Sequence, residues 1–512
     1  MRPERCLAST NMQNGGESRN NVANKFFKKL SGWFTKISVR LPTHRLIGAI
    51  VVVAIGGAIP LLSAWQVAVA AGDEVRPLVT QRELPASSAT PIMSARRIPQ
   101  TLVDLISDGR AQRKYSQVIA ALPPDSCLNV VTDSRTVIEV NSLKPLIPGS
   151  NLKLLTAAVA LDVLGPERKF VTKMLGIVSG SVVRGDLWLV GSGDPLLATR
   201  AYPLTEKYPT LTPTDVEKLV DALVALGVTS IEGSVIGDES LYDRERYVPS
   251  WGDGIRSVEA GPLGALMIND GSVSGSPLKP VNPAFAAATE FTTLLVSRGI
   301  AVRDTPDIGT ASADTPIIAT LESVPMQQIV AEMLVNSDNN TAELLVKEIG
   351  LVARGSATRI DGLNVIALKV AEWGLPGAGV ALLDGSGLDR TNLLTCNLIV
   401  QLLQRDGPDG LVTTALATAG KSGTLRDVFL TGPGAGTMRA KTGTLNGVKS
   451  LSGMFPLDDG RSSVFALIMN GSGSSTLDFY RPIWNNLVNA LASGNTRLDV
   501  NDLSPLKISP EP

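Results

Sequence analysis

The sequence predicts an α/β domain that is interrupted by an insertion and preceded by one membrane-spanning helix. Three observations lead to this prediction. A run of apolar and small residues at 46–71 follows a basic leader. Strand-like, helix-like and Gly/Pro-rich segments alternate over 165–321. Short apolar runs joined by turn residues then follow near the C-terminus, which is typical of an antiparallel sheet.

Length and composition restrict the class of protein. A chain of 512 residues is too long for one simple core, so we expect several domains or one domain with a large insertion. The net charge of −1 and the aromatic content of 4% argue against a nucleic-acid partner. The only histidine, His44, precedes the apolar run, which excludes Ser-His-Asp and Cys-His catalysis in the chain beyond it.

The apolar run at 46–71 is long enough to cross a hydrocarbon core of about 30 Å. The tail at 1–45 carries nine Lys or Arg and two acidic residues. The positive-inside rule therefore predicts a cytoplasmic N-terminus, a single-pass anchor in the cell membrane and a domain outside the cytoplasm. The alternative is a cleaved signal peptide with its site at Ala68-Val69-Ala70, which would give a secreted protein.

The remaining chain divides by composition. Four prolines among polar residues at 72–100 predict an extended linker. Within the insertion, Thr212 and Pro213 predict the N-cap and first position of a helix over 215–226. The predicted parts are a cytoplasmic tail at 1–45, an anchor at 46–71, a linker at 72–100, a split α/β domain at 101–164 and 322–495, an inserted domain at 165–321, and a tail at 496–512.

The split domain is predicted to contain a sheet formed by both ends of the chain. Strands are expected at 127–132, 135–140, 437–444, 448–454 and 463–469, with a closing helix at 477–492. On the predicted topology Cys127 and Cys396 both face an oxidising space. They either form a disulfide or are two separate buried thiols, and the sequence leaves both possibilities open.

A hydrolase without histidine needs another base, and the run from Ser150 to Lys153 provides a serine with a lysine three residues later. Ser150 opens an apolar run of strong helix formers, whereas the Ser-x-x-Lys runs at Ser276 and Ser504 are followed by proline. At the first turn of a helix, residues i and i+3 share a face, so the Lys153 amine can reach the Ser150 hydroxyl. Read alone, this tetrapeptide is more often an N-capping serine with a solvated lysine.

A second candidate motif is Ser337-Asp338-Asn339, between two predicted helices. Side chains in such a loop can project into a cleft. Ser337 can relay a proton to a leaving amine, and Asn339 can hold a substrate amide. The alternative interpretation is a capping loop that precedes the helix at Thr341.

The third candidate motif is Lys441-Thr442-Gly443, on a predicted strand. A strand edge can pair with an extended peptide, Gly443 leaves room for a close approach, and Lys441 offers a cation for a carboxylate. A similar run at Lys421 lies in less regular surroundings. The alternative is an ordinary strand that ends in a surface lysine.

The conjunction of the three motifs, in this order and without a catalytic histidine, resembles the active-site set of the serine penicillin-recognising enzymes. The separation of Ser150 from Ser337 is similar to that in the D-alanyl-D-alanine carboxypeptidase/endopeptidase family of low-molecular-mass penicillin-binding proteins, which carries an inserted domain there. Further matches are Gly191-Ser-Gly-Asp-Pro195, Ser337 to Glu343, Asp384-Gly-Ser-Gly-Leu388, Gly423 to Arg426 and Arg439 to Leu445. The resemblance covers roughly residues 100–495.

The resemblance implies a β-lactamase/transpeptidase-like domain, in which helices flank an antiparallel sheet. It implies that Ser150 attacks the carbonyl between the last two D-alanines of a peptidoglycan stem peptide, Lys153 accepts its proton and Ser337 relays one to the leaving D-alanine. The implied binding residues are Asn339 for the stem amide, Lys441, Thr442 and Thr444 for the terminal carboxylate, and the backbone N–H groups of Ser150 and Thr444 for the oxyanion. No metal or cofactor is implied, and β-lactams would acylate Ser150.

Two other functions are compatible with the same motifs. A β-lactamase shares the acylation apparatus but deacylates rapidly, and no dedicated deacylation glutamate is evident. A non-catalytic wall-binding scaffold or antibiotic sensor would keep the pocket without turnover. The sequence does not separate carboxypeptidase from endopeptidase activity and does not indicate an oligomeric state.

Overall fold

The α/β fold predicted from the sequence is confirmed. The computed structural model describes residues 99–458 and 460–494. The predicted cytoplasmic tail, the anchor at 46–71, nearly all of the linker and the C-terminal tail lie outside the described residues. Within the part of the chain that the structure describes, no helix combines the length and the apolar character needed to cross a bilayer.

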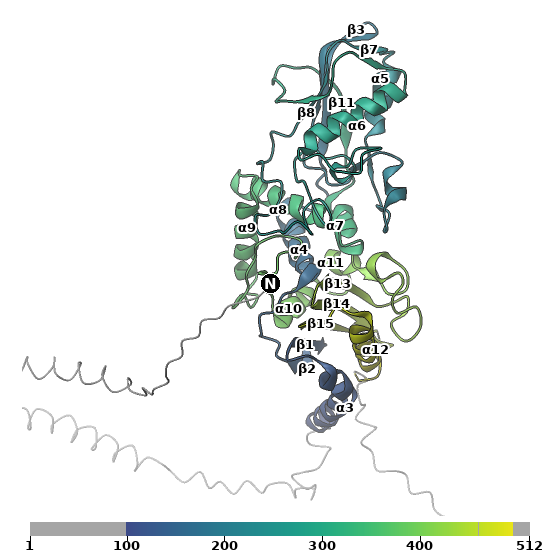
Figure 1. Cartoon of the computed structure of the whole chain (residues 1–512). Helices are drawn as coiled ribbons and strands as arrows, with labels where there is room; N and C mark the ends of the chain where they lie inside the picture. The colour runs from purple at the N-terminus through teal and green to yellow at the C-terminus, as the bar shows by residue number, and fades with distance from the viewer. Residues whose placement is uncertain (1–98, 459, 495–512) are drawn as a thin grey trace, which may run out of the picture. The chain divides into compact units, whose positions relative to one another are not determined.

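A six-stranded antiparallel sheet contains the third motif and joins the two ends of the described chain (Figure 1). Its order is β12-β13-β14-β15-β1-β2. Residues far apart in sequence therefore pair directly, as Cys127 does with Ile468. The strands are β1 (Asp125–Thr132), β2 (Arg135–Val140), β12 (Ala417–Thr418), β13 (Arg439–Leu445), β14 (Val448–Pro456) and β15 (Ser462–Asn470).

Both faces of this sheet are buried, because alternate residues of each strand enter different cores. In β15, Leu467 packs with the terminal helices, whereas Ile468 packs with the helices of the opposite face. The terminal helices are α3 (Pro99–Ala121) and α12 (Leu477–Gly494). The opposite core contains residues of α4 (Lys153–Leu164), α7 (Met326–Val335), α8 (Asn339–Arg354), α9 (Arg359–Glu372) and α10 (Cys396–Asp406).

One covalent link crosses the sheet–helix contact of this second core. Cys127 in β1 and Cys396 at the start of α10 form a disulfide with their Cα atoms 6.0 Å apart. Both cysteines are fully buried. Of the two possibilities that the sequence left open, the structure has the disulfide.

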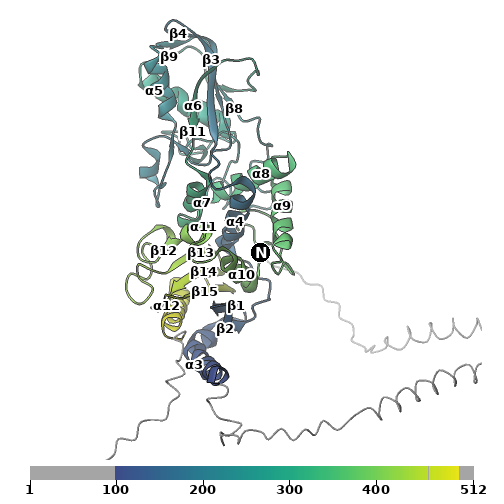
Figure 2. The same ribbon diagram turned by 180° about the vertical axis from the view of Figure 1, so that it is seen from behind.

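A second sheet draws its strands from residues 171–322, all within the predicted insertion except Glu322 (Figure 2). Its main path is β10-β8-β4-β3-β11, with β7 beside β4 and β9 beside β7. Helices α5 (Glu217–Ala225) and α6 (Pro283–Ser297) share a core with it. The strands are β3 (Val171–Ser179), β4 (Val182–Val190), β7 (Ser230–Ile231), β8 (Val235–Asp238), β9 (Ala301–Val302), β10 (Asp307–Ile308) and β11 (Ile317–Glu322).

The predicted start of the first helix in this region is wrong. Instead of continuing a helix from Thr212, the chain forms a short parallel bridge in which the Thr214 N–H donates to Leu196 O. Helix α5 begins two residues after Asp215, whose side chain accepts the Glu217 N–H. A long-range backbone pairing therefore outweighs the local Thr-Pro signal.

Candidate active site

Ser150 lies in a 3-10 turn that leads directly into helix α4. The turn spans Gly149–Leu152, and Lys153 is the first residue of α4. The expected i, i+3 geometry is present, because the Lys153 Nζ donates to the Ser150 Oγ at 3.0 Å. Ser150 lines a pocket, whereas Lys153 is fully buried behind it. The serine is thus accessible and its lysine partner is shielded from solvent.

The amine of Lys153 has two further hydrogen-bond acceptors. It donates to the Asn339 Oδ1 at 2.6 Å and to the Ser386 carbonyl at 2.7 Å. Burial lowers the pKa of Lys153 to about 8, against an opposing influence of nearby carboxylates, of which Asp384 is the strongest. An amine with this pKa can exchange its proton near neutral pH, as a general base requires.

The second motif spans the junction between α7 and α8. Ser337 has a left-handed backbone (φ 64°), which is uncommon for a residue other than glycine. Asp338 is the N-cap of α8, and its side chain accepts the Thr341 N–H at 2.5 Å. Asn339 begins the helix and does not lie in the expected loop. The capping interpretation and the catalytic one are therefore both compatible with this segment.

Asn339 links three parts of the chain. Its Oδ1 accepts from Lys153, and its Nδ2 donates to the Glu259 carbonyl at 2.8 Å. Glu259 belongs to the predicted insertion. The side chain that was expected to hold a substrate amide also fixes the orientation of the lysine.

The third motif lies on β13 and meets the second. Lys441 is fully buried, and its Nζ donates to the Ser337 Oγ at 2.8 Å and to the Thr442 carbonyl at 2.9 Å. Burial, followed by the nearby cations Lys153 and Lys449, holds the pKa of Lys441 well below its ordinary value. Lys441 thus contacts the second serine directly and does not line the pocket.

A close approach between β13 and the 3-10 turn that carries Ser150 explains the glycine of the third motif. A Cβ at Gly443 would lie 2.2 Å from the Ser450 Oγ and 2.6 Å from the Pro148 carbonyl oxygen. A Cβ at Gly149, where φ is 54°, would lie 3.2 Å from the Thr444 nitrogen. The backbones that carry the Ser150 and Thr444 N–H groups therefore lie against each other, as the expected oxyanion site requires.

Sequence reasoning assigned no role to the loop that starts at Asp384, although the loop contacts both the turn that carries Ser150 and the Lys153 side chain. The Ser386 carbonyl accepts from Lys153, and a Cβ at Gly387 would lie 2.0 Å from the Gly149 carbonyl oxygen. The signal was present as an Asp-Gly-Ser-Gly run, which is typical of a tight turn. Its distance from Lys153 in sequence concealed the contact.

Two buried carboxylates hold this loop by its backbone. Glu343 in α8 accepts the Ser386 N–H at 2.8 Å, and burial raises the pKa of Glu343 to about 7. Asp384 accepts the Gly387 N–H at 2.8 Å and the Trp251 Nε1–H at 3.0 Å. A tryptophan from the predicted insertion therefore supports the loop that contacts Lys153.

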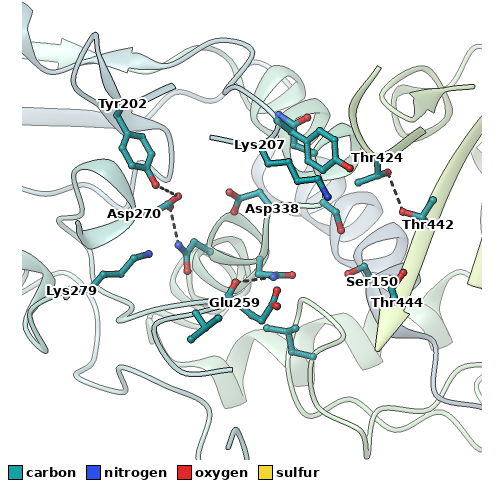
Figure 3. Close-up of a pocket in the computed structure, with 17 residues that line it drawn as sticks. Ser150, Tyr202, Lys207, Glu259, Asp270, Lys279, Asp338, Thr424, Thr442 and Thr444 are labelled. Atoms are coloured by element: carbon teal, nitrogen blue, oxygen red, sulfur yellow. Dashed lines mark hydrogen bonds between the residues drawn. The ribbon is translucent and has the colours of Figure 1, made fainter. Parts of the chain in front are cut away.

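The pocket in front of Ser150 has a volume of about 500 Å³ and a mostly polar lining (Figure 3). Ser150, Thr442 and Thr444 lie together on one side of it. On the opposite side the Tyr202 hydroxyl donates to Asp270 at 3.0 Å. The other lining residues are Lys207, Tyr208, Val258, Glu259, Lys279, Asn336, Ser337, Asp338, Asn339, Asn340, Leu388 and Thr424. The described residues contain no cluster of side chains suited to a metal ion.

Comparisons with known proteins place this chain among carboxypeptidases in sequence. The model of the D-Ala-D-Ala carboxypeptidase 3 (S13) family matches residues 126–281 and 276–483. A D-alanyl-D-alanine carboxypeptidase of Actinomadura sp. (strain R39) is 29% identical over 505 residues, which cover 79% of this chain and 91% of that protein. A carboxypeptidase of Mycobacterium tuberculosis is 31% identical over 343 residues, which cover 64% of this chain and 72% of that protein.

A solved structure is similar in fold. Penicillin binding protein 4 from Haemophilus influenzae superposes with a TM-score of 0.59 at 20% sequence identity. The match covers 73% of this chain and 99% of that one. At this identity the similarity concerns the fold alone, and it agrees with the α/β architecture described above.

Proposed function

The chain belongs to the D-Ala-D-Ala carboxypeptidase 3 (S13) family, and on this premise we propose that it is a serine-type D-Ala-D-Ala carboxypeptidase that acts on peptidoglycan stem peptides through an acyl-enzyme on Ser150. One observation carries the proposal. Two serine–lysine pairs, Ser150 with Lys153 at 3.0 Å and Ser337 with Lys441 at 2.8 Å, meet at one pocket. This arrangement can remove a proton from the nucleophile and deliver one to the leaving amine.

In the acylation step, Lys153 accepts the Ser150 proton while the Oγ attacks the carbonyl of the penultimate D-alanine. The backbone N–H groups of Ser150 and Thr444 stabilise the oxyanion, and loss of one such donor typically slows a reaction about 10²–10³-fold. Ser337, hydrogen-bonded to Lys441, protonates the departing D-alanine. Water then hydrolyses the ester on Ser150, and a β-lactam forms the same ester but leaves it slowly.

We place the substrate carboxylate at the Thr442–Thr444 side of the pocket. Thr442 and Thr444 line the pocket, and the amine of the buried Lys441 donates to the Thr442 carbonyl behind them. Asn339 receives the stem amide. The pocket volume of about 500 Å³ also supports a proposal that the enzyme cuts cross-links between stems, because a second peptide can occupy the space beyond Ser150.

We place the catalytic domain outside the cytoplasm, tethered to the cell membrane by the predicted helix at 46–71. The buried Cys127–Cys396 disulfide supports this location, since such bonds persist in oxidising compartments. Protease treatment of intact cells would degrade an external domain and would spare a cytoplasmic one.

The first test is incubation of the full-length chain in detergent with labelled penicillin, followed by intact mass and peptide mapping. We expect a stable adduct on Ser150 and, in a second assay, release of D-alanine from a pentapeptide. Rapid turnover of the drug without a lasting adduct would favour a β-lactamase. A folded protein that neither forms the adduct nor releases D-alanine would favour a non-catalytic scaffold.

A further inference from the structure

Another buried lysine, Lys449, lies beside the third motif on the neighbouring strand. In the β13–β14 register Lys449 pairs with Thr444, so the two side chains leave the same face of the sheet. The Lys449 side chain is only 8% exposed and its ammonium lies over two rings of α12, 4.1 Å from the centroid of Tyr480 and 4.9 Å from that of Trp484. These cation–π contacts hold the charged end in one position.

The hydrogen bond from Lys449 makes a pocket hydroxyl an acceptor. The Lys449 Nζ donates to the Thr444 Oγ1 at 2.8 Å. Because an ammonium group has donors and no acceptor, the Thr444 oxygen must accept in this pair. The hydroxyl proton of Thr444 is then left for another acceptor, and Thr444 is exposed at the pocket.

Unlike Thr444, Lys441 and Thr442 direct their hydrogen-bond donors to acceptors within the protein. The Lys441 amine is directed to Ser337 and to a backbone carbonyl. The Thr442 hydroxyl donates to the Thr424 Oγ1 at 3.0 Å. Of the three groups expected to bind a carboxylate, Thr444 is therefore the one whose hydroxyl proton is not donated to its protein partner.

We propose that Lys449 is a positioning residue for the substrate carboxylate: it holds the Thr444 hydroxyl as a hydrogen-bond donor toward the free α-carboxylate of the C-terminal D-amino acid. The inference rests on the proposed function, because it assumes that this carboxylate binds beside Thr444. The cation also strengthens the donor and adds positive potential behind it. Lys449 thereby selects a peptide that ends in a free acid over one whose end is blocked.

The same geometry predicts a pH dependence. Burial, and then Arg481 on α12, lower the pKa of Lys449 to about 8. Lys441 on β13 is another nearby cation. Neutral lysine has a lone pair that can accept the Thr444 hydrogen and turn it away from the pocket. The preference for a free carboxylate should therefore decline as the pH rises through about 8.

The test compares two peptides that differ only at the C-terminus, one ending in D-Ala-D-Ala and one in D-Ala-D-alaninamide. The full-length enzyme, Lys449→Met and Lys449→Arg are assayed for kcat/KM on both. We expect Lys449→Met to reduce kcat/KM for the free acid about 10–100-fold, mainly through KM, and to leave the amide within about twofold. Lys449→Arg, which keeps the charge and the donor, should restore most of the preference.

Two further variants, Thr444→Val and the double variant Lys449→Met/Thr444→Val, decide whether Lys449 acts through the Thr444 hydroxyl. If it does, Lys449→Met has no further effect on the acid-to-amide ratio in the Thr444→Val background. An equal loss on both peptides, or a full additional loss in the double variant, would overturn the inference. Should Lys449→Met not fold, the wild-type ratio measured from pH 7 to 9 gives the answer: a decline that Thr444→Val abolishes supports the inference, and a flat profile refutes it. A wild-type protein inactive on both peptides would instead refute the proposed function.

Discussion

Lys153 and Lys441 occupy two sides of one active site, and both are fully buried with a serine hydroxyl as partner. Their surroundings differ in charge. Four carboxylates oppose the effect of burial on Lys153, with Asp384 the strongest, whereas the charged groups that act on Lys441 are cations. The same side chain in the same degree of burial therefore has two different electrostatic settings.

This difference in charged neighbours explains how Lys153 and Lys441 can have different roles. On the nucleophile side the carboxylates keep the Lys153 pKa at about 8, within reach of proton exchange at neutral pH. On the β13 side burial and neighbouring cations lower the pKa values of Lys441 and Lys449, and no anion is among the groups that shift the pKa of either lysine.

The largest expected effect is that of removing the base. Lys153→Ala should reduce the rate of acylation by labelled penicillin about 10⁴–10⁶-fold, because Ser150 loses its proton acceptor. Lys153→Arg should be equally inactive, since a guanidinium keeps the charge but cannot lose a proton. A substantial rate in either variant, with native circular dichroism, would show that the two lysines do not differ in role as described.

The next largest effect is expected on the opposite side. Lys441→Ala should reduce kcat/KM for D-alanine release about 10²–10³-fold, because Ser337 loses its partner and the carboxylate loses a nearby cation. The matched control is Lys421→Ala, in the similar Lys-Ser-Gly run, where the lysine donates to the Gly436 carbonyl at the surface. That variant should retain full activity. A loss at Lys441 as large as that at Lys153 would contradict the division of roles.

The comparison also predicts a pH profile. At saturating labelled penicillin, the acylation rate should rise about tenfold from pH 7 to 9 and then level off, because the neutral fraction of Lys153 increases through a pKa of about 8. Asp384→Asn should move the midpoint to lower pH, since Asp384 is the carboxylate that raises this pKa most. An unchanged midpoint in a folded variant would show that the carboxylates do not set the lysine pKa.

The smallest effect is expected at Trp251, which supports the carboxylate side from the predicted insertion. Trp251→Phe removes one hydrogen-bond donor from Asp384. The Asp384 carboxylate still accepts from the Gly387 and Asp389 N–H groups and from the Asn392 amide. We expect a loss of stability of about 1.5–3 kcal/mol in urea unfolding, with acylation slowed only severalfold.

Trp373→Phe is the matched control for this prediction, because the Trp373 ring packs against Arg405. This variant should be acylated at the wild-type rate. An effect on acylation as large as that of Trp251→Phe would mean that the contact with Asp384 has no special importance.

The parts of this site that could be predicted from the sequence are those with a local geometric cause. Ser150 and Lys153 meet because residues i and i+3 share a helix face, and Gly443 lies where two backbones approach closely. The three strands of the C-terminal meander agree with the prediction to within two residues at each end, because their apolar runs end at turn residues. The functional roles of these side chains stay predictions.

The remainder depends on contacts between distant segments, which leave no local pattern. The Ser386 carbonyl reaches Lys153 across 233 positions of sequence. Lys449 looks like an ordinary strand lysine, since its partners Tyr480 and Trp484 belong to another helix. Asn339 was expected in a loop, but the Asp338 side chain caps a helix that begins at Asn339, two residues before the predicted start at Thr341.

The disulfide determines what happens to the molecule when a protease cuts the chain once. Cys127 and Cys396 close a covalent ring that contains Ser150 and Ser337 and leaves Lys441 outside. A single protease cut at any exposed turn within the ring cannot release a fragment, because the bridge still joins the two pieces. A nicked, penicillin-labelled chain would therefore run as one band without reductant and as two with it.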